Sequence, residues 1–237
     1  MKELDYPIVN TMGMAYKFNE SFFENINSEE KAYWLGFISA DGGINIPGIG
    51  RDSGWVLCIN LKKEDKEHLE KFQKSIERFG PIYETNNCVR LQIGSEKLIK
   101  SLIAQGVGPQ KSHTLNPWKG PKNLESAYWR GLFDGDGSIS KTFRQKREIE
   151  YVVWRLSLNG NRFIINGFQE FLQRQGIKRL GSLQKHSSIY KVQWGGFESA
   201  ALVAQQIYEN PLIYLERKRS LFKELLDSYE TKTSNKK

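Results

Sequence analysis

The apolar residues follow a pattern that predicts helices and strands in the same order twice along the chain. Apolar residues recur every three to four positions in Glu67–Phe79 and Arg162–Gln175, as in an amphipathic helix. Residues that favour strands fill Trp55–Leu61 and Tyr151–Asn159, which are bounded by glycine or charged residues. Each half therefore has the order helix, two strands, helix, two strands, helix. The later helices are predicted over Ser95–Gln105, Phe197–Tyr208 and, at the end, about Pro211–Tyr229.

Two of the predicted strands alternate strictly between apolar and polar residues. In VRLQIG the polar residues Arg90 and Gln92 share one face, and in YKVQWG the polar residues Lys191 and Gln193 do the same. Such alternation is typical of a sheet that packs one face on a core and leaves the other face polar.

The first predicted helix precedes the first pair of strands. Asn27 followed three residues later by Glu30 fits the capping box that begins many helices. The run Asp41-Gly42-Gly43 suits the left-handed turn that ends many helices. We therefore expect this helix to begin after Asn27 and to end at Asp41.

An internal repeat explains why the order occurs twice. The segment SEEKAYWLGFISADGGI, from Ser28 to Ile44, aligns without gaps with NLESAYWRGLFDGDGSI, from Asn123 to Ile139. VRLQIG and YKVQWG align with each other further along, in the same order. Two ordered matches predict a duplication. We place the halves at residues 1–116 and 117–237, joined by the proline- and glycine-rich segment GVGPQKSHTLNPWKGPKN.

Composition excludes several classes of protein. The chain has 237 residues, of which 39% are hydrophobic, and this apolar content excludes a disordered protein. No run approaches the roughly 18 apolar residues of a membrane span, and the first residues lack an apolar signal core. We therefore expect no membrane partner and an intracellular location, in a bacterial or phage cytoplasm or an organelle matrix. Cys58 and Cys88 lie in apolar segments and are expected to be buried thiols.

The net charge of +8 favours a polyanionic partner. The alternative is that this charge only keeps the protein soluble. Its densest basic segment runs from Lys141 to Arg155. Three common kinds of site are excluded. GVGPQKS lacks the glycine that a P-loop has before its lysine, DGDGSIS lacks the glycine at the sixth position of an EF-hand loop, and the histidines and cysteines lack the spacing of zinc ligands.

The repeated helix carries small residues on one face in both copies. They are Gly36 and Ala40 in the first copy and Gly131 and Gly135 in the second. This four-residue spacing lets two helix backbones approach closely. A glycine inside a helix costs about 1 kcal/mol, and an ordinary core helix would leave that cost unexplained twice. We therefore expect the two helices to pair at an interface between the halves.

An aspartate, Asp41 or Asp136, follows each small-residue face. A carboxylate at a helix C-terminus meets the negative end of the helix dipole, at a cost of about 0.3–1 kcal/mol. Paired helices would also bring the two carboxylates together. A divalent cation between them would offset both costs, since carboxylates are hard oxygen ligands. The alternative is that each Asp-Gly pair is a plain helix stop, but its occurrence in both copies favours a metal site.

The two motif segments, WLGFISADG and WRGLFDGDG, resemble two copies of the LAGLIDADG motif. Over essentially its whole length the chain resembles a single-chain, two-repeat LAGLIDADG homing endonuclease. The resemblance implies an α+β fold of two pseudo-symmetric αββαββα repeats, with the motif helices paired at the interface and the antiparallel sheets forming a DNA-binding saddle. The chain departs from the family pattern at Ser39, where an aspartate is common, and at Arg130, where alanine is common.

The resemblance also implies an activity, the site-specific hydrolysis of double-stranded DNA at a long, pseudo-palindromic target. Asp41 and Asp136 would bind Mg²⁺, and Mn²⁺ or Ca²⁺ would fit the same sites. The family adds a basic residue near the metals, for which the candidates are Lys111 and Lys218. The alternative for each lysine is an ordinary surface position. We expect the protein to act as a monomer.

The sheets would read the DNA, because a β-ribbon fits the major groove. Arginine and lysine favour guanine, and glutamine favours adenine. The alternative is a polar sheet face that simply contacts water, but the shared order of a basic residue and then glutamine favours DNA. The expected DNA-binding residues are Arg51, Lys62, Arg90, Gln92, Arg144, Lys146, Arg147, Arg155, Lys191 and Gln193.

Two further functions stay open on the sequence. One is an intron RNA maturase or a non-cleaving nucleic-acid-binding protein on the same scaffold. The other is a basic two-repeat interaction protein with no nucleic-acid role. Retention of Asp41 and Asp136 argues against an inactive scaffold, but it is compatible with an enzyme that also binds intron RNA.

Overall fold

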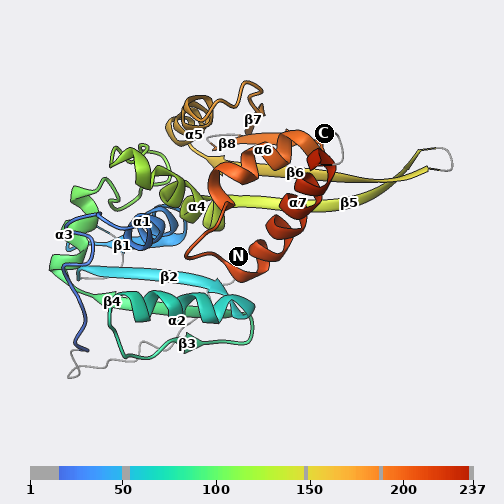
Figure 1. Ribbon diagram of the computed structural model, residues 1–237. Coiled ribbons are helices and arrows are strands. Elements are labelled where there is room, and N and C mark those ends of the chain that lie inside the picture. Colours follow the sequence, from blue (N-terminus) through green and yellow to red (C-terminus); the bar gives the residue numbers. More distant parts are fainter. Residues whose placement is uncertain (1–15, 50–53, 147–148, 187–188, 235–237) are drawn as a thin grey trace.

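The computed structural model describes residues 16–49, 54–146, 149–186 and 189–234. These residues form two four-stranded antiparallel sheets with helices packed against them (Figure 1). The α+β fold class predicted from the sequence is therefore confirmed. Within the described ranges, every helix falls short of the length and apolar content that a membrane span requires.

The first sheet and its helices follow the predicted order of elements. The strands pair in the order β1-β2-β4-β3, and all three pairings are antiparallel. The elements are α1 (Glu29–Asp41), β1 (Gly42–Asn45), β2 (Val56–Lys62), the 3-10 turn Lys63–Asp65, α2 (Lys66–Ser75), β3 (Tyr83–Glu84), β4 (Cys88–Gly94) and α3 (Glu96–Ala104).

The second sheet repeats this arrangement and adds one helix at the end. Its strand order, β5-β6-β8-β7, is that of the first sheet, as a duplication predicts. The division of the chain at residue 116 stays a prediction. The elements are the 3-10 turn Lys122–Leu124, α4 (Glu125–Asp136), β5 (Gly137–Lys146), β6 (Ile149–Gly160), α5 (Arg162–Arg174), β7 (Ser182–His186), β8 (Ile189–Gly195), α6 (Phe197–Tyr208) and α7 (Glu216–Ser234).

Alternation of apolar and polar residues decides which face of each sheet is covered. Leu57, Ile59 and Leu61 of β2 are buried, whereas Asn60 and Lys62 between and beside them are exposed. The same alternation in β4 and β8 buries the apolar residues under the helices. Each sheet therefore keeps one polar, open face.

The two cysteines differ in burial. Cys58 of β2 is buried, but Cys88 at the start of β4 is only half-buried. The expected burial therefore holds for Cys58 alone. Both cysteines lie on the open face of the first sheet, but Cys58 is in the middle of β2, opposite Gln92, whereas Cys88 is the first residue of β4, opposite the exposed Lys62.

The structure confirms that α1 ends at Asp41, and it corrects the predicted capping residue and the predicted form of the turn after the helix. Ser28, not Asn27, caps the helix, because its Oγ accepts a hydrogen bond from the backbone N–H of Lys31 at 3.3 Å. Gly42 has φ −76°, so the helix does not end in a left-handed turn. Glycine is needed there because a Cβ would lie 2.7 Å from the carbonyl oxygen of Ile38, where the chain turns directly into β1.

The last helix begins at Glu216, later than the predicted start at Pro211. The N–H of Leu212 donates to Glu29 at 3.0 Å, and the N–H of Leu215 donates to Asp134 at 2.9 Å. Because distant carboxylates take these hydrogen bonds, the apolar segment before Glu216 remains a non-helical link.

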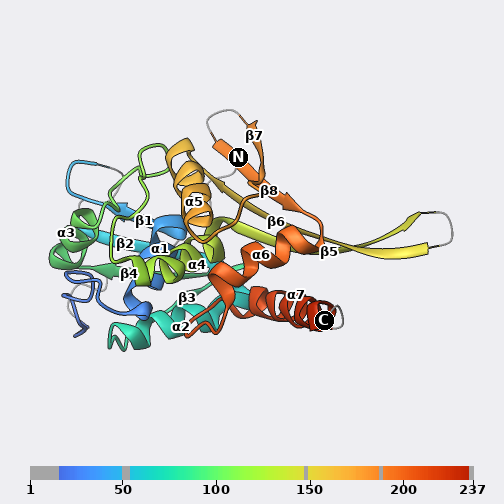
Figure 2. The same cartoon turned by 45° about the horizontal axis from the view of Figure 1, so that its top comes forward.

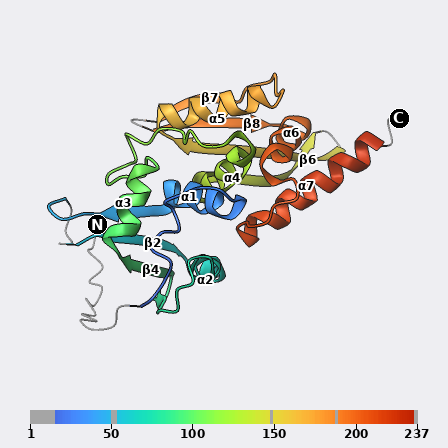
Figure 3. The same cartoon turned by 60° about the vertical axis from the view of Figure 1, so that its left-hand side comes forward.

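The helices α1 and α4 lie side by side between the two sheets (Figures 1 and 3). A Cβ on Gly36 would lie 1.9 Å from the carbonyl oxygen of Tyr128, and one on Gly131 would lie 2.0 Å from that of Tyr33. The two backbones therefore touch where the sequence placed its small residues. Further along, a Cβ on Gly135 would lie 2.3 Å from the Cβ of Ala40.

The start of α7 also connects the second half of the chain to the first. Figure 2 shows this end of α7 beside α2. Arg217 donates through Nε to both carboxylate oxygens of Asp65, at 2.9 and 3.1 Å, and Lys71 forms an ion pair with Glu216. The position of α7 is therefore set by both sheets and not only by its own.

Candidate active site

Two carboxylates meet where α1 and α4 end. Asp41 and Asp136 are the last residues of these helices. Oδ2 of Asp41 lies 3.1 Å from the position that a Cβ on Gly135 would occupy, so its carboxylate lies against α4 next to Asp136. Burial, and then the negative charge of Asp136, raise the pKa of Asp41 to about 6, and burial raises the pKa of Asp136. The two acidic groups therefore share one desolvated site.

Two lysines bind the ends of the same helices. Lys111 donates through Nζ to the carbonyl oxygen of Ala40 in α1 at 3.0 Å. Lys218, at the start of α7, is buried and donates to the carbonyl oxygens of Phe133, Asp134 and Gly137 at 2.8, 2.6 and 2.6 Å. Ala40 and Asp134 lie in the last turns of α1 and α4, where a helix end leaves carbonyl groups without helical partners, so each lysine stabilises one helix end. The structure thus brings Lys111 and Lys218 to the two aspartates.

The electrostatic coupling between lysines and aspartates runs across the helix pair. Of the two lysines, Lys218 lowers the pKa of Asp41 more, although it binds the end of α4. At Asp136 the order is reversed: Lys111, which binds the end of α1, lowers the pKa of Asp136 more than Lys218 does. Burial lowers the pKa of Lys218 to about 8 and also lowers that of Lys111. Both lysines therefore act on both aspartates, across the helix pair.

A buried carboxylate that the sequence analysis passed over holds Lys218 in place. The carboxylate of Asp134 accepts hydrogen bonds from the hydroxyl of Tyr33 at 2.7 Å, the hydroxyl of Tyr208 and the N–H of Leu215 at 2.9 Å. Leu215 immediately precedes α7, so Asp134 fixes the start of the helix that carries Lys218. The sequence shows an acidic residue two positions before Asp136, but it does not show that this residue is buried, because its hydrogen-bond partners are remote in sequence.

The first copy of the motif has Ser39 at the position equivalent to Asp134. Its Oγ donates to the carbonyl oxygen of Leu35 at 2.8 Å, and a hydrogen bond with Ser39 lowers the pKa of Tyr128, which burial raises to about 12. Tyr33 and Tyr128 are themselves equivalent in the repeat. Each tyrosine therefore reaches across the helix pair to the polar residue of the other motif.

Arg130 departs from the motif because it connects three elements. This buried side chain donates through Nε to the carbonyl oxygen of Ile213 at 2.8 Å and through Nη1 to that of Ile207 at 3.2 Å. Its Nη2 forms an ion pair with Glu29 at the start of α1. Arg130 thus ties α4 to α1 and to the link that leads into α7.

The donor set at the helix ends fits a divalent cation. The described part of the chain contains no group of three or more His, Cys, Asp or Glu side chains placed to hold a metal ion. Mg²⁺ is commonly bound by only one or two carboxylates, with water and substrate phosphate completing its ligands. Two convergent carboxylates with raised pKa values match that pattern, because a cation would offset their desolvation and repulsion.

Replacing Asp41 by asparagine is expected to stabilise the folded protein at neutral pH. The carboxyl has its pKa raised from 3.8 to about 6 in the folded state. The carboxyl of Asp41 therefore stabilises the folded protein fully below pH 3.8, its pKa in the unfolded chain, and this stabilisation is lost as the pH rises through about 6, its pKa in the folded protein. At pH 7, without divalent cations, Asp41→Asn should be more stable by up to about 3 kcal/mol, and near pH 4 the gain should vanish.

Urea unfolding at both pH values measures this difference. Asp227→Asn is the control, because Asp227 is exposed and forms an ion pair with Lys223 on the surface of α7. Added Mg²⁺ should stabilise the wild type and leave Asp41→Asn nearly unchanged. Equal stabilities of wild type and Asp41→Asn at pH 7 would contradict the shared desolvated site.

The open faces of the two sheets carry matching polar pairs. In the first sheet Arg90 lies opposite Asn60, to which it donates through Nε at 2.8 Å, and Gln92 lies opposite Cys58. In the second sheet Lys191 lies opposite Asn159 and Gln193 lies opposite Ser157. The strand register therefore places an asparagine, Asn60 or Asn159, directly opposite the basic residue of each predicted pair. The sequence alone did not indicate these asparagines.

The other predicted DNA-binding residues fall into three groups. Arg155 is half-buried on the open face of β6, opposite Ser140, while Lys62 and Arg144 are exposed. Lys146 is the last residue of β5, but its side chain lies outside the described residues. Arg51 and Arg147 also lie outside them.

Comparison with known proteins agrees with this geometry. Residues 123–207 match the protein family described as a LAGLIDADG-like domain. An uncharacterized protein of Methanocaldococcus jannaschii is 25% identical over 160 residues, which cover 65% of this chain but only 57% of that protein. The chain thus spans little more than half the length of this curated relative.

Solved LAGLIDADG nucleases share the fold at low sequence identity. The I-LtrWI homing endonuclease bound to target DNA has a TM-score of 0.61 and 12% identity, covering 90% of this chain and 92% of its own. The I-AabMI meganuclease bound to uncleaved DNA has a TM-score of 0.58 and 15% identity, covering 85% and 91%. I-SmaMI bound to cleaved DNA has a TM-score of 0.58 and 13% identity, covering 89% and 92%.

Proposed function

We propose that this chain is a site-specific DNA endonuclease. It has the two-repeat fold of LAGLIDADG homing endonucleases, and its residues 123–207 match a LAGLIDADG-like domain. It hydrolyses one phosphodiester bond in each strand of a long, pseudo-palindromic target, and it requires a divalent cation, normally Mg²⁺. The proposal rests chiefly on the meeting of Asp41 and Asp136 at the ends of α1 and α4, beside Lys111 and Lys218.

The four charged side chains have separate roles in this proposal. Asp41 and Asp136 would hold the cation, which supplies Lewis acidity toward the phosphate and lowers the pKa of a bound water. Lys218 remains mostly protonated at neutral pH, because its pKa is about 8. Together with Lys111 it places positive charge beside the scissile phosphates, where negative charge increases in the transition state.

The open sheet faces supply the recognition. Arginine and lysine bond to guanine and glutamine bonds to adenine in the major groove, and these residue types lie together on both faces. The faces differ in detail, since Arg90 and Cys58 of the first sheet correspond to Lys191 and Ser157 of the second. A single chain with two unequal faces can act as a monomer on a target that is not a perfect palindrome.

Selection of cleaved targets tests the proposal. The purified protein is incubated with Mg²⁺ and a plasmid library that carries randomised inserts, and the linearised plasmids are sequenced. We expect one long motif to be enriched and cut at a fixed position in each strand. Failure to linearise any plasmid would contradict endonuclease activity.

The same preparation separates the other candidate functions. Tighter binding to intron RNA than to duplex DNA, without cutting, would favour a maturase or a non-cleaving binder. An endonuclease should lose DNA affinity steeply as salt rises, because basic residues release counterions from the phosphates. A flat salt dependence would favour an interaction protein without a nucleic-acid partner.

A further inference from the structure

The first strand pair of the second sheet is much longer than its counterpart in the first sheet. The strands β5 and β6 form ten register pairs, from Gly137–Leu158 to Lys146–Ile149. Among the residues that the structure describes, the strands β1 and β2 form four, from Gly42–Ile59 to Asn45–Val56. Both ladders start directly after the aspartate of their motif, so their lengths can be compared from the same origin.

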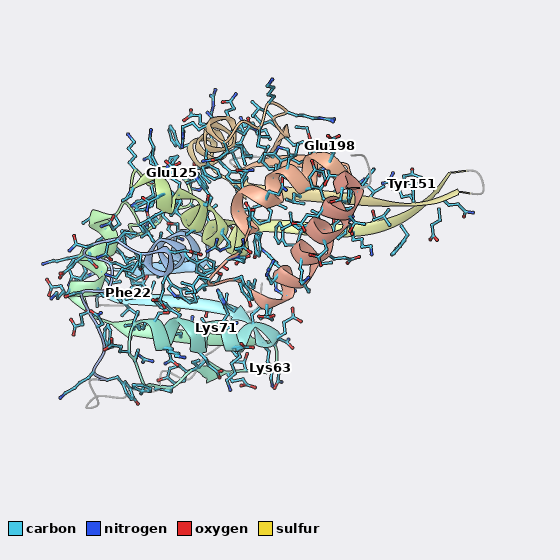
Figure 4. All side chains as sticks on the ribbon, in the orientation of Figure 1. Phe22, Lys63, Lys71, Glu125, Tyr151 and Glu198 are labelled. Carbon is cyan, nitrogen blue, oxygen red and sulfur yellow. The ribbon has the colours of Figure 1, made fainter. Side chains whose placement is uncertain are left out.

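The outer part of β5 and β6 extends beyond the helices that cover the second sheet. Lys141 forms an ion pair with Glu224 of α7, and its Nζ lies 5.8 Å from the centroid of the Trp154 ring. Beyond this point the side chains of Phe143 and Tyr151 are 63% and 42% exposed. Figures 1 and 4 show this ribbon, with Tyr151 labelled, projecting past α7. A two-stranded ribbon is marginally stable alone in water, which suggests a partner along its length.

The position and charge of the ribbon favour duplex DNA as that partner. Arg144 lies opposite Tyr151, on the face that continues through Thr142 and Ser140 to the open face of the sheet at Arg155. The stretch from residue 141 to residue 154 contains four basic and two acidic residues. A ribbon of this kind fits the major groove, which is about 12 Å wide.

We propose that the protein covers its DNA target asymmetrically, with the β5–β6 ribbon contacting base pairs that the first half of the chain does not reach on its own side. The six additional register pairs, ten against four, extend the ribbon by about 20 Å. At about 3.4 Å per base pair, the footprint is about six base pairs longer on the side of the second half. This inference rests on the proposed function, and it places Arg144 and Tyr151 among the residues that set specificity.

A shortened ribbon tests the inference. Residues 142–153 are removed and Lys141 is joined to Trp154 through Asn-Gly, because these two residues are register partners and a two-residue turn preserves the pairing. The change is made in the double variant Asp41→Asn and Asp136→Asn, which is expected to bind DNA without cutting it. The probe is a duplex selected from a random library by the double variant with the full-length ribbon.

Hydroxyl-radical footprinting measures the protected region on each side of the position that the wild type cuts. We expect the full-length ribbon to protect about six more base pairs on one side, and the shortened ribbon to lose that protection on that side only. Val152→Thr is the matched control, because Val152 lies on the opposite face of the ribbon from Arg144, and it should keep the full footprint.

A point variant keeps the inference testable even when the shortened chain does not fold. Arg144→Ala should remove base preference at the outermost positions and weaken binding to the selected duplex about tenfold. Equal protection on the two sides, or an unchanged footprint and base preference in these variants, would overturn the inference. Failure of the proposed function would look different, because no duplex would be selected or the wild type would not cut the selected one.

Discussion

Replacing either Asp41 or Asp136 by asparagine is expected to lower the rate of DNA cleavage at least about a thousandfold, which corresponds to about 4 kcal/mol of transition-state stabilisation. Asparagine keeps the shape of the side chain but removes the charge that holds the cation. Because both carboxylates share one site at the ends of α1 and α4, either change alone should impair cleavage of both strands.

The measurement is the first-order rate of strand cleavage on the selected target, with each strand labelled separately. DNA affinity should change less than about threefold, since neither aspartate lies on an open sheet face. Asp227→Asn on α7 should cleave like the wild type, because it removes only a surface ion pair. Unchanged cleavage by Asp41→Asn or by Asp136→Asn would refute the assignment of these residues.

Adding one methyl group at Gly36 or Gly131 is expected to destabilise the fold by about 3 kcal/mol or more. Alanine is the better helix former by about 1 kcal/mol, so helix propensity alone predicts a gain. The contact between the helices reverses that sign, because the new Cβ would lie 1.9 Å or 2.0 Å from a backbone oxygen of the facing helix. Backbone atoms on both sides leave little room for relaxation.

Urea unfolding midpoints of Gly36→Ala and Gly131→Ala measure this cost. Gly195→Ala is the control, since within the described part of the chain no atom beyond its sequence neighbours lies within 4 Å of the added Cβ, and its φ is not positive. The control should stay within about 0.5 kcal/mol of the wild type. Wild-type stability in both helix variants would mean that α1 and α4 are not in backbone contact.

The sequence repeat predicted most of the architecture because the physical signals involved are local. Small residues four positions apart indicated where the helices touch, and the alternation around Arg90 and Lys191 indicated which sheet faces stay open. The aspartate that ends each motif then had to lie next to its counterpart. Once two helices with equivalent small-residue faces pair about a pseudo-twofold axis, equivalent residues on the shared face meet.

The polar contacts around Asp134 and Arg130 could not be predicted in the same way. Tyr208, one partner, is the last residue of α6. Ile213 and Leu215 lie on the link that follows, whose path depends on how α6 and α7 pack. A local pattern says that a polar side chain on a buried face needs a partner, but it does not say which distant group provides it. For the same reason the apolar residues of this link resemble, in the sequence alone, the start of the last helix.

The length of the β5–β6 ribbon was also missed. Its basic residues were noticed as a cluster, and β6 was predicted to begin only at Tyr151, whereas it begins at Ile149. Exposed strands lack the apolar alternation that marks half-buried ones, since neither face of the outer ribbon packs on a core. The pairing of Arg144 with Tyr151 therefore becomes visible only in the strand register.

Anomalous scattering from Mn²⁺, in crystals of the protein with its selected duplex, shows whether Asp41 and Asp136 jointly bind the cation that supports cleavage. We expect a peak at the ends of α1 and α4, with carboxylate oxygens of both aspartates and a DNA phosphate oxygen among its ligands. A structure with Mn²⁺ bound only at other places would contradict this assignment. So would one in which the two carboxylates lie too far apart to coordinate the same cation together with a DNA phosphate.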